Sequence, residues 1–314
     1  MEIELRGVAA AQGWPAPACR CASCCRLRAA GVRYEPFAAT VDGVALEDLP
    51  RTGVPGGYEV LAPGGGRVLV AEGPGARPEP SPGVRYDAVL LDLAGSPDHL
   101  GYLRHAGAVT RETRVVAVHT DHRLPSPSEL DRRMAFWNRS EQGPFRTLLL
   151  GGSRSGKSAE AELRLVACSD VLYVATGPVR DDDPEWAGRV AAHRLRRPAW
   201  WRTVETTDLA GVLASATGPV LVDGVGTWLA AAMSEADAWD DPARVRPHVD
   251  GLVAAWRGTA ARVVAVSDEV GLSVVPATAS GRAFRDALGE ANQRLAAESE
   301  EAALVVAGRA MELR

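Results

Sequence analysis

The sequence lacks the features that mark several broad classes of protein. Basic residues do not outnumber acidic ones: the formal net charge is −5, and no basic run stands out as a patch for nucleic acid or a membrane surface. No apolar stretch approaches the roughly 20 residues of a membrane-spanning helix, and no secretion signal opens the chain. We therefore expect a cytoplasmic protein with small-molecule partners, no nucleic-acid partner and no membrane span, and leave open whether it forms a homo-oligomer.

Cysteine is also scarce, and its placement does not suit a disulfide framework. Four of the five cysteines crowd into one short segment, as Cys19, Cys21, Cys24 and Cys25, and the fifth is Cys168. In a chain without a secretion signal, such cysteines stay reduced or bind metal. The spacing alone leaves both alternatives open.

Lysine is nearly absent, because the 35 basic residues comprise 34 arginines and a single lysine, Lys157. Arginine ends in a wide planar fork, whereas lysine ends in a compact ammonium. A lone lysine in an arginine-rich chain therefore indicates a site that needs a slim point charge. The motif around Lys157 shows what kind of site that is.

The length of the chain and its apolar runs predict two α/β domains. With 314 residues and 46% hydrophobic content, each domain has enough chain for its own core. We place the boundary after a polar segment, which gives domains 1–143 and 144–314. Apolar runs at 88–91 and 114–118 predict a small α/β unit in the first domain. In the second, helix-length segments alternate with apolar runs, which is typical of a mostly parallel sheet with helices on both faces; the runs are 147–150, 171–175, 220–222, 263–266 and 304–306.

The most specific motif lies at the start of the second domain, between an apolar strand and a helix. The pattern G-x-x-x-x-G-K-[ST] is matched by Gly151, Gly152, Ser153, Arg154, Ser155, Gly156, Lys157 and Ser158. In such a P-loop, backbone N–H groups and the helix N-terminus surround phosphate oxygens. Lys157 would reach the β- and γ-phosphates of ATP or GTP, and Ser158 would bind Mg²⁺. An ordinary glycine-rich turn is the alternative, but the position of the only lysine argues against it.

An acidic residue downstream fits the same site. Asp223 follows the apolar run 220–222, as the Mg²⁺-binding acid of a P-loop enzyme does. The alternative is a solvated acid at the end of a strand. Given the P-loop, we favour the magnesium role.

Several further blocks follow the P-loop in order. They are YVAT at 173–176, RVAAHR at 189–194, RP at 197–198, WRTVE at 201–205, LVD at 221–223, DEVG at 268–271, VP at 275–276, FRDALG at 284–289 and NQRLA at 292–296. A P-loop by itself singles out no family, but this ordered set does. From residue 151 onward the chain resembles the bifunctional adenosylcobinamide kinase/adenosylcobinamide-phosphate guanylyltransferases of cobalamin biosynthesis.

The resemblance implies a RecA-like P-loop fold and two reactions at one nucleotide site. Adenosylcobinamide would be phosphorylated by ATP or GTP. GMP from GTP would then join that phosphate through a histidine–GMP intermediate, giving adenosylcobinamide-GDP and pyrophosphate. Lys157 would serve both steps and His193 would be the nucleophile. By block position the nucleotide or its ribose would be lined by Thr176, Arg194, Arg196 and Glu205.

Two positions depart from the family pattern. Many members carry two adjacent histidines where this chain has Ala192 and His193, so that only the second is available as nucleophile. The residue before Glu-Val-Gly is usually asparagine and is Asp268 here. The contact made at that position is therefore left open.

The N-terminal half resembles a different family. Its glycine turn and its C-x-C-x-x-C run resemble the start of metallo-β-lactamase-fold phosphodiesterases of phosphonate utilisation. In those proteins three thiolates and a late histidine hold a structural zinc, which here implies Cys19, Cys21, Cys24 and His122 as ligands. Solvated reduced cysteines beside a surface histidine remain the alternative.

The catalytic signature of that fold, H-x-H-x-D-H, is absent from the sequence. Asp92 and His119 are the plausible remnants of its dinuclear metal site, and too few residues precede Asp92 to supply the missing strands and motif. A hydrolytic metal centre needs more ligands than these. We interpret residues 1–143 as a shortened, non-catalytic module.

Two other functions remain open on the sequence alone. One is a P-loop kinase or NTPase that acts on another small molecule, and the other is a non-enzymatic nucleotide-binding or scaffold protein. The combination of Lys157, Ser158 and Asp223 argues against the scaffold. His193 together with the blocks at 197–205 favours the corrinoid enzyme over another P-loop kinase.

Overall fold

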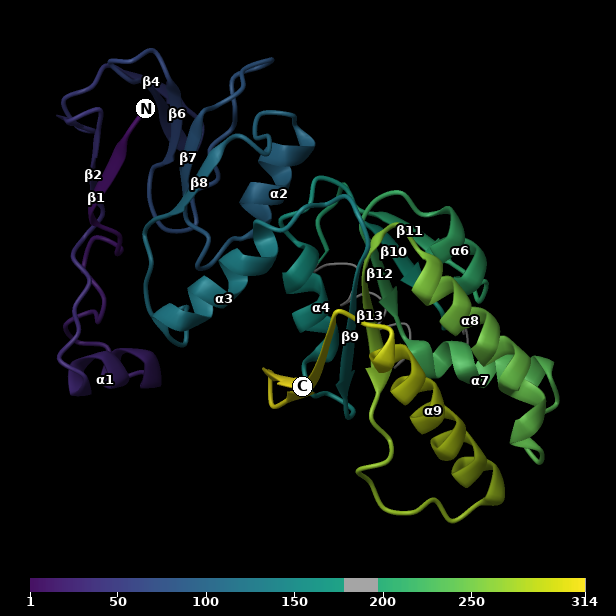
Figure 1. Cartoon of the computed structure of the whole chain (residues 1–314). Coiled ribbons are helices and arrows are strands. Elements are labelled where there is room, and N and C mark those ends of the chain that lie inside the picture. Colours follow the sequence, from purple (N-terminus) through teal and green to yellow (C-terminus); the bar gives the residue numbers. More distant parts are fainter. Residues whose placement is uncertain (178–196, 314) are drawn as a thin grey trace. The chain divides into compact units, whose positions relative to one another are not determined.

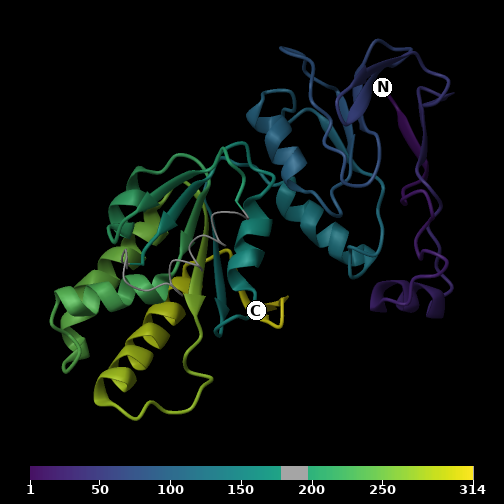
Figure 2. The same cartoon turned by 180° about the vertical axis from the view of Figure 1, so that it is seen from behind.

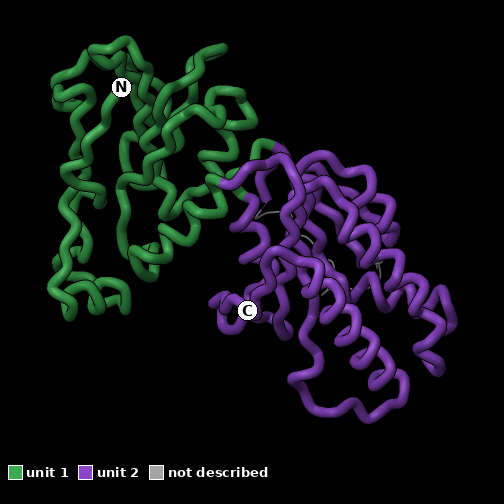
Figure 3. Tube along the Cα trace, in the orientation of Figure 1, with its two compact units in different colours: residues 1–138, 166–169 green, residues 139–165, 170–314 purple. Residues whose placement is uncertain are grey.

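The computed structural model describes residues 1–177 and 197–313, which form two compact units (Figure 1). Unit 1 contains Met1–Asn138 and Val166–Ser169, and unit 2 contains Arg139–Leu165 and Asp170–Arg314 (Figure 3). The sequence placed the boundary between residues 143 and 144, and the chain leaves unit 1 after Asn138. Residues 166–169 belong to unit 1 through contacts with residues distant in sequence, which the local sequence does not predict.

Unit 1 is built on two sheets. The first is antiparallel, with order β1-β2-β3, from Ile3–Gly7, Ala38–Val41 and Val44–Ala45. The second has order β4-β5-β6-β7-β8, and its last three strands are parallel. Those strands are Arg51–Val54, Gly57–Leu61, Arg67–Ala71, Ala88–Leu91 and Arg114–Ala117. The described helices of the unit are α1 (Ala22–Ala29), α2 (Asp98–His105) and α3 (Pro127–Trp137).

The two sheets of unit 1 share one core. Val41 of β2 packs in the same buried cluster as Val68 of β6 and Leu90 of β7. Because side chains alternate along a strand, Leu91 points to the opposite face of the second sheet, and it is also fully buried. The predicted α/β unit is present as β7 and β8 with α2 between them. Strands β2 to β6 were not predicted, and glycine and proline crowd residues 50–83, which contain β4, β5 and β6.

Unit 2 contains one sheet, with order β11-β10-β12-β13-β9-β14-β15. All neighbouring strands are parallel except the β14–β15 hairpin. The strands are β9 (Phe145–Gly151), β10 (Leu172–Ala175), β11 (Arg202–Glu205), β12 (Val220–Asp223), β13 (Arg262–Asp268), β14 (Glu301–Val306) and β15 (Arg309–Leu313). The apolar runs predicted as buried strands are β9, β10, β12, β13 and β14, which confirms the mostly parallel α/β fold.

Helices cover both faces of this sheet (Figure 1 and Figure 2). On one face a single core joins strand residues such as Leu148 and Ala265 to Leu229, Leu252 and Leu288 of three helices. The opposite face is covered by α4. The described helices are α4 (Lys157–Leu165), α6 (Leu209–Ser215), α7 (Val225–Glu235), α8 (Arg246–Gly258) and α9 (Ala279–Ala297), with a short 3₁₀ turn η1 (Pro242–Val245). No described helix of the chain has the length and apolar character that crossing a membrane requires.

The register of the parallel strands places several polar residues at one edge of the sheet. Asp268 pairs with Gly151, so the last residue of β13 lies beside the last residue of β9. Asp223 pairs with Ala175 of β10 on one side and Val266 of β13 on the other. Because the carboxyl ends of parallel strands share an edge, this edge is where an open α/β sheet binds ligands.

Candidate nucleotide site and a separate cysteine–histidine cluster

The phosphate-binding motif has the local geometry that its sequence predicts. β9 ends at Gly151, α4 begins at Lys157, and a tight turn joins them. Gly156 has a φ of +99°, and a Cβ there would lie 3.0 Å from the Cα of Gly308. Only glycine combines that backbone conformation with so close an approach. The Gly308 N–H donates to the Ser155 carbonyl at 2.8 Å, which ties the turn to the β14–β15 hairpin.

The lysine of the motif lies inside the turn and is largely shielded from solvent. Its ammonium Nζ donates to the Gly152 carbonyl at 3.2 Å and forms an ion pair with Asp268 Oδ1 at 2.8 Å. The Lys157 side chain is 14% exposed, and that of Asp268 is 39% exposed. The charge predicted for phosphate binding is therefore held by a loop carbonyl and a carboxylate at the end of the neighbouring strand.

Asp223 and Ser158 meet as the magnesium prediction requires. The Ser158 hydroxyl donates to Asp223 Oδ1 at 3.2 Å. The other carboxylate oxygen, Oδ2, accepts a hydrogen bond from the Tyr173 hydroxyl. Burial and the adjacent Asp223 charge raise the pKa of Tyr173, so the phenol stays protonated as a donor. A hydroxyl and a carboxylate are hard oxygen donors of the kind that Mg²⁺ prefers, so this pair fits the ion.

Thr176 and Glu205 were predicted to line the nucleotide, and the structure gives them different surroundings. The Thr176 hydroxyl donates to the Gly224 carbonyl at 2.5 Å and lies 2.6 Å from the Thr227 hydroxyl. It therefore holds the turn between β12 and α7. Glu205 is exposed at the end of β11, which is the outermost strand on one side of the sheet. The other predicted residues of this group, His193, Arg194 and Arg196, lie outside the described residues.

Two residues of the site were not predicted in these roles, namely Tyr173 and Asp268. Tyr173 belongs to a block that supports the family resemblance, but its bond to Asp223 depends on the pairing of β10 with β12. Asp268 was recognised only as a departure from the family pattern. Its contact with Lys157 could have been expected from the sequence. Asp268 ends a predicted parallel strand, and the carboxyl ends of parallel strands lie on the same side of the sheet as the P-loop.

In unit 1 a second cluster contains three of the four predicted zinc ligands. The ligand atoms of Cys19, Cys24 and His122 all lie within 4.8 Å of one another, and among the described residues they form a group of three such side chains that could hold a metal ion. Cys21 is the N-cap residue of α1, and its sulfur accepts the Cys24 N–H at 3.5 Å. That hydrogen bond lowers the pKa of Cys21, whereas burial raises the pKa of Cys24 to about 11.

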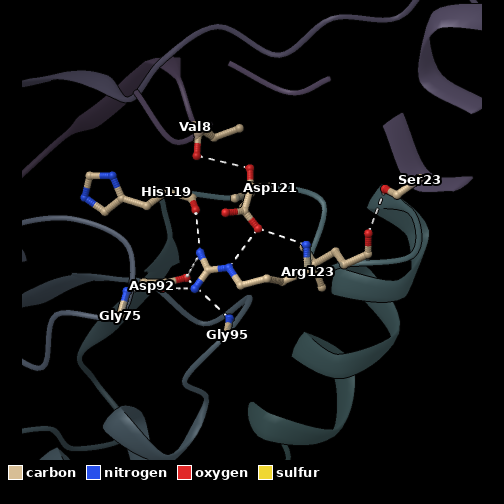
Figure 4. Close-up of polar contacts among 10 residues, drawn as sticks. Val8, Ser23, Gly75, Asp92, Gly95, His119, Asp121 and Arg123 are labelled. Atoms are coloured by element: carbon tan, nitrogen blue, oxygen red, sulfur yellow. Dashed lines mark hydrogen bonds and ion pairs between the residues drawn. The ribbon is translucent and has the colours of Figure 1, made fainter. Parts of the chain in front are cut away.

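The two residues interpreted as remnants of a dinuclear metal site are engaged in other contacts (Figure 4). Asp92 is fully buried, and its carboxylate accepts hydrogen bonds from the Arg123 guanidinium at 2.7 and 3.2 Å. The Gly75 N–H donates to the same carboxylate at 2.6 Å. His119 Nε2 lies 3.1 Å from the Ala71 carbonyl. A guanidinium thus binds both oxygens of Asp92 that a metal would need.

The fold and the site of unit 2 together define a class of protein. A parallel sheet, a glycine-rich strand–helix turn, an ammonium inside that turn and a hydroxyl–carboxylate pair beside it form a P-loop nucleotide-binding site. The family model of cobinamide kinase / cobinamide phosphate guanyltransferase matches residues 147–313, and the chain belongs to this family. The resemblance seen in the sequence blocks is thereby confirmed, and with it the prediction of an enzyme.

Curated relatives match the same part of the chain. The bifunctional adenosylcobalamin biosynthesis protein CobU of Escherichia coli is 38% identical over 174 residues, which cover 51% of this chain and 95% of the relative. CobU of Salmonella typhimurium is 37% identical over 174 residues, which again cover 51% of this chain and 95% of the relative. CobP of Pseudomonas aeruginosa is 39% identical over 176 residues, 54% of this chain and 98% of the relative. The family match begins at residue 147, so the metallo-β-lactamase resemblance of residues 1–143 stays a prediction.

Proposed function

We propose that unit 2 carries out both reactions of cobalamin biosynthesis that its family name describes. Adenosylcobinamide is first phosphorylated by ATP or GTP, and GMP from GTP is then transferred to adenosylcobinamide phosphate, giving adenosylcobinamide-GDP and pyrophosphate. The observation that carries the proposal is the P-loop itself, with Lys157 inside the turn and Ser158 beside Asp223 in a chain of this family.

The phosphorylation step uses the groups at the end of β9 and the start of α4. Lys157 and the backbone N–H groups of the turn neutralise the phosphates and align the γ-phosphoryl group with the substrate hydroxyl. Ser158 and Asp223 would hold Mg²⁺, which neutralises phosphate charge when bound. The substrate hydroxyl oxygen forms a bond to the γ-phosphorus, the bond to the β-phosphate oxygen breaks, and the hydroxyl proton leaves.

The second step needs a nucleophile, and we assign it to His193. An unprotonated ring nitrogen attacks the α-phosphorus of GTP, and the bond to pyrophosphate breaks. A phosphate oxygen of adenosylcobinamide phosphate then displaces the histidine and receives GMP. Arg194 and Arg196 follow the histidine in sequence and can neutralise the triphosphate during attack.

The experiment is incubation of the full chain with Mg²⁺, adenosylcobinamide and nucleotide, followed by chromatography of the corrinoid. With ATP alone we expect adenosylcobinamide phosphate as the end product, because ATP carries no guanylyl group. Addition of GTP should convert that product to adenosylcobinamide-GDP. Nucleotide hydrolysis with an unchanged corrinoid would instead favour a P-loop enzyme acting on another small molecule.

For unit 1 we propose a shortened metallo-β-lactamase-like module with a structural zinc and no hydrolytic activity. The support is the proximity of Cys19, Cys24 and His122, with Cys21, the N-cap of the helix that contains Cys24, to supply a fourth ligand. Three thiolates and one imidazole form a closed tetrahedral set, which leaves no open position for a substrate. The Asp92–Arg123 ion pair supports the absence of a second, catalytic metal.

A further inference from the structure

Asp268 occupies a built position at the nucleotide site. It ends β13, and its backbone carbonyl accepts a hydrogen bond from the Asn292 amide at 3.1 Å. The oxygen of Asn292 accepts the buried Ser267 hydroxyl at 2.6 Å, so α9 fixes the strand end on which Asp268 lies. The Asp268 backbone is thus held by a network within unit 2.

The carboxylate of Asp268 lies between two elements of the site. Oδ1 is 2.8 Å from the ammonium of Lys157. Oδ2 lies against the first turn of α7, where a Cβ on Gly226 would be only 2.7 Å away. A side chain at Gly226 would therefore displace the carboxylate. Because Gly226 has no side chain, Asp268 has room to reach Lys157.

The charge balance gives this contact a consequence for nucleotide binding. A triphosphate requires the Lys157 ammonium, which Asp268 and the Gly152 carbonyl both hold. Asp223 and Asp268 end the neighbouring strands β12 and β13; Asp268 pairs with this ammonium and Asp223 accepts the Ser158 hydroxyl beside it, and a triphosphate adds several negative charges. A divalent cation offsets that charge, whereas free nucleotide must compete with Asp268 for the lysine.

We propose that Asp268 is a positioning residue that holds Lys157 in the nucleotide-free enzyme and makes nucleotide binding depend on a divalent cation. The proposal rests on the nucleotide-binding role of the P-loop given above, and it does not depend on the identity of the corrinoid substrate. Asp268→Asn keeps the size of the side chain and removes the charge that pairs with Lys157.

The first test measures GTP affinity by calorimetry, with excess Mg²⁺ and with EDTA, for the full-length protein and two variants. Without divalent cation, Asp268→Asn should bind GTP about tenfold more tightly than wild type, because one nearby negative charge is gone. With Mg²⁺ the difference should shrink to about threefold or less. Asp237→Asn is the matched control, since Asp237 is an exposed acid that pairs with Arg244 at 3.1 Å after the far end of α7, and it should behave as wild type in both conditions.

A second readout uses the fact that Lys157 is the only lysine of the chain. Reductive methylation followed by peptide mass spectrometry reports its reactivity separately from that of the N-terminal amine. Asp268→Asn should be methylated at Lys157 several-fold faster than wild type, because an amine released from an ion pair is more available to the reagent. Mg²⁺ with GTP should protect Lys157 in both proteins.

The possible outcomes separate the two proposals. If wild type binds no nucleotide in either condition, the proposed function of unit 2 is wrong. If wild type binds GTP but Asp268→Asn shows the same gain from Mg²⁺ and the same methylation rate, Asp268 does not restrain Lys157. Weaker GTP binding by the variant in both conditions would make Asp268 a direct nucleotide contact and would also overturn the inference.

Discussion

Asp92 in unit 1 and Asp223 in unit 2 look alike in the sequence and do different things in the structure. Each comes directly after a buried apolar run: Asp92 follows β7, and Asp223 is the last residue of β12. Asp92 is fully buried and neutralised by Arg123, which adds further bonds to Asp121 and to the His119 carbonyl. Asp223 is half-buried and faces a serine hydroxyl at the start of α4.

The difference shows what converts a strand-end acid into a functional group. A guanidinium has five donors in a rigid fork and can saturate a carboxylate, as Arg123 does at both oxygens of Asp92. The Ser158 hydroxyl and the Tyr173 phenol each donate one hydrogen bond to Asp223, and, because both are neutral, neither offsets its charge as a guanidinium does. The partner therefore decides whether the acid serves stability or ligand binding.

The largest effect on activity should come from Lys157, which pairs with Asp268 in unit 2. We expect Lys157→Ala to abolish both phosphorylation and guanylyl transfer, by about 10³-fold or more, because both steps neutralise phosphate charge in one cradle. Lys157→Arg should also be badly impaired, since the wide guanidinium does not fit where a compact ammonium lies. Rates of both product formations in the corrinoid assay measure this, and near-normal activity of the arginine variant would refute the argument from the single lysine.

Loss of the histidine should abolish the covalent guanylyl step without abolishing phosphorylation. Incubation of wild type with α-labelled GTP should label the protein through a P–N bond, which is lost in acid and survives alkali. His193→Ala should remove the label and the guanylyl transfer while retaining at least part of the phosphorylation, because γ-phosphoryl transfer uses the P-loop and not this nucleophile. A labelled alanine variant would place the nucleophile elsewhere, and an unlabelled wild type would indicate direct transfer.

Exchanging each aspartate for asparagine tests the comparison directly. Asp223→Asn should lower turnover by about 10²-fold with little change in the free energy of unfolding, because its charge serves the ligand. Asp92→Asn should leave turnover unchanged and lower the free energy of unfolding of unit 1 by about 2 kcal/mol, because it breaks a buried ion pair. Denaturant titration and the corrinoid assay measure both variants. Glu35→Gln is the control, since the Arg33–Glu35 pair is exposed, and it should change stability by less than about 0.5 kcal/mol.

The smallest change in activity is expected at the cysteine–histidine cluster. Purified protein should contain about one zinc per chain, and Cys24→Ser should lose it. Cys25→Ser is the matched control, because Cys25 is exposed and outside the cluster. Neither variant should alter the corrinoid reactions of unit 2 by more than about twofold. Unchanged zinc in Cys24→Ser, or hydrolysis of a model diester by the wild type, contradicts the interpretation of unit 1.

Much of unit 2 was predictable because its signals are local. A strand, a glycine turn and a helix follow one another over residues 147–165, and contiguous residues largely dictate their geometry. The apolar runs predicted the parallel strands for the same reason, since strands buried on both faces are apolar throughout. In unit 1 the antiparallel strands of residues 38–61 escaped prediction, because partners and edges rather than composition define them.

The sequence by itself determined the P-loop, the family of residues 147–313 and the positions of the strand-end acids. Only the tertiary structure decided what each acid faces. Asp268 reaches Lys157 because β13 lies beside β9 in register, and because Gly226 leaves space at the start of α7. Arg123 reaches Asp92 because β7 and β8 are parallel neighbours, so that the segments that follow them begin at the same end of the sheet. An apolar run followed by an acid predicts that the acid lies at the end of a buried strand. Which distant residue the acid contacts depends on strand order and register, and a short stretch of sequence does not specify these.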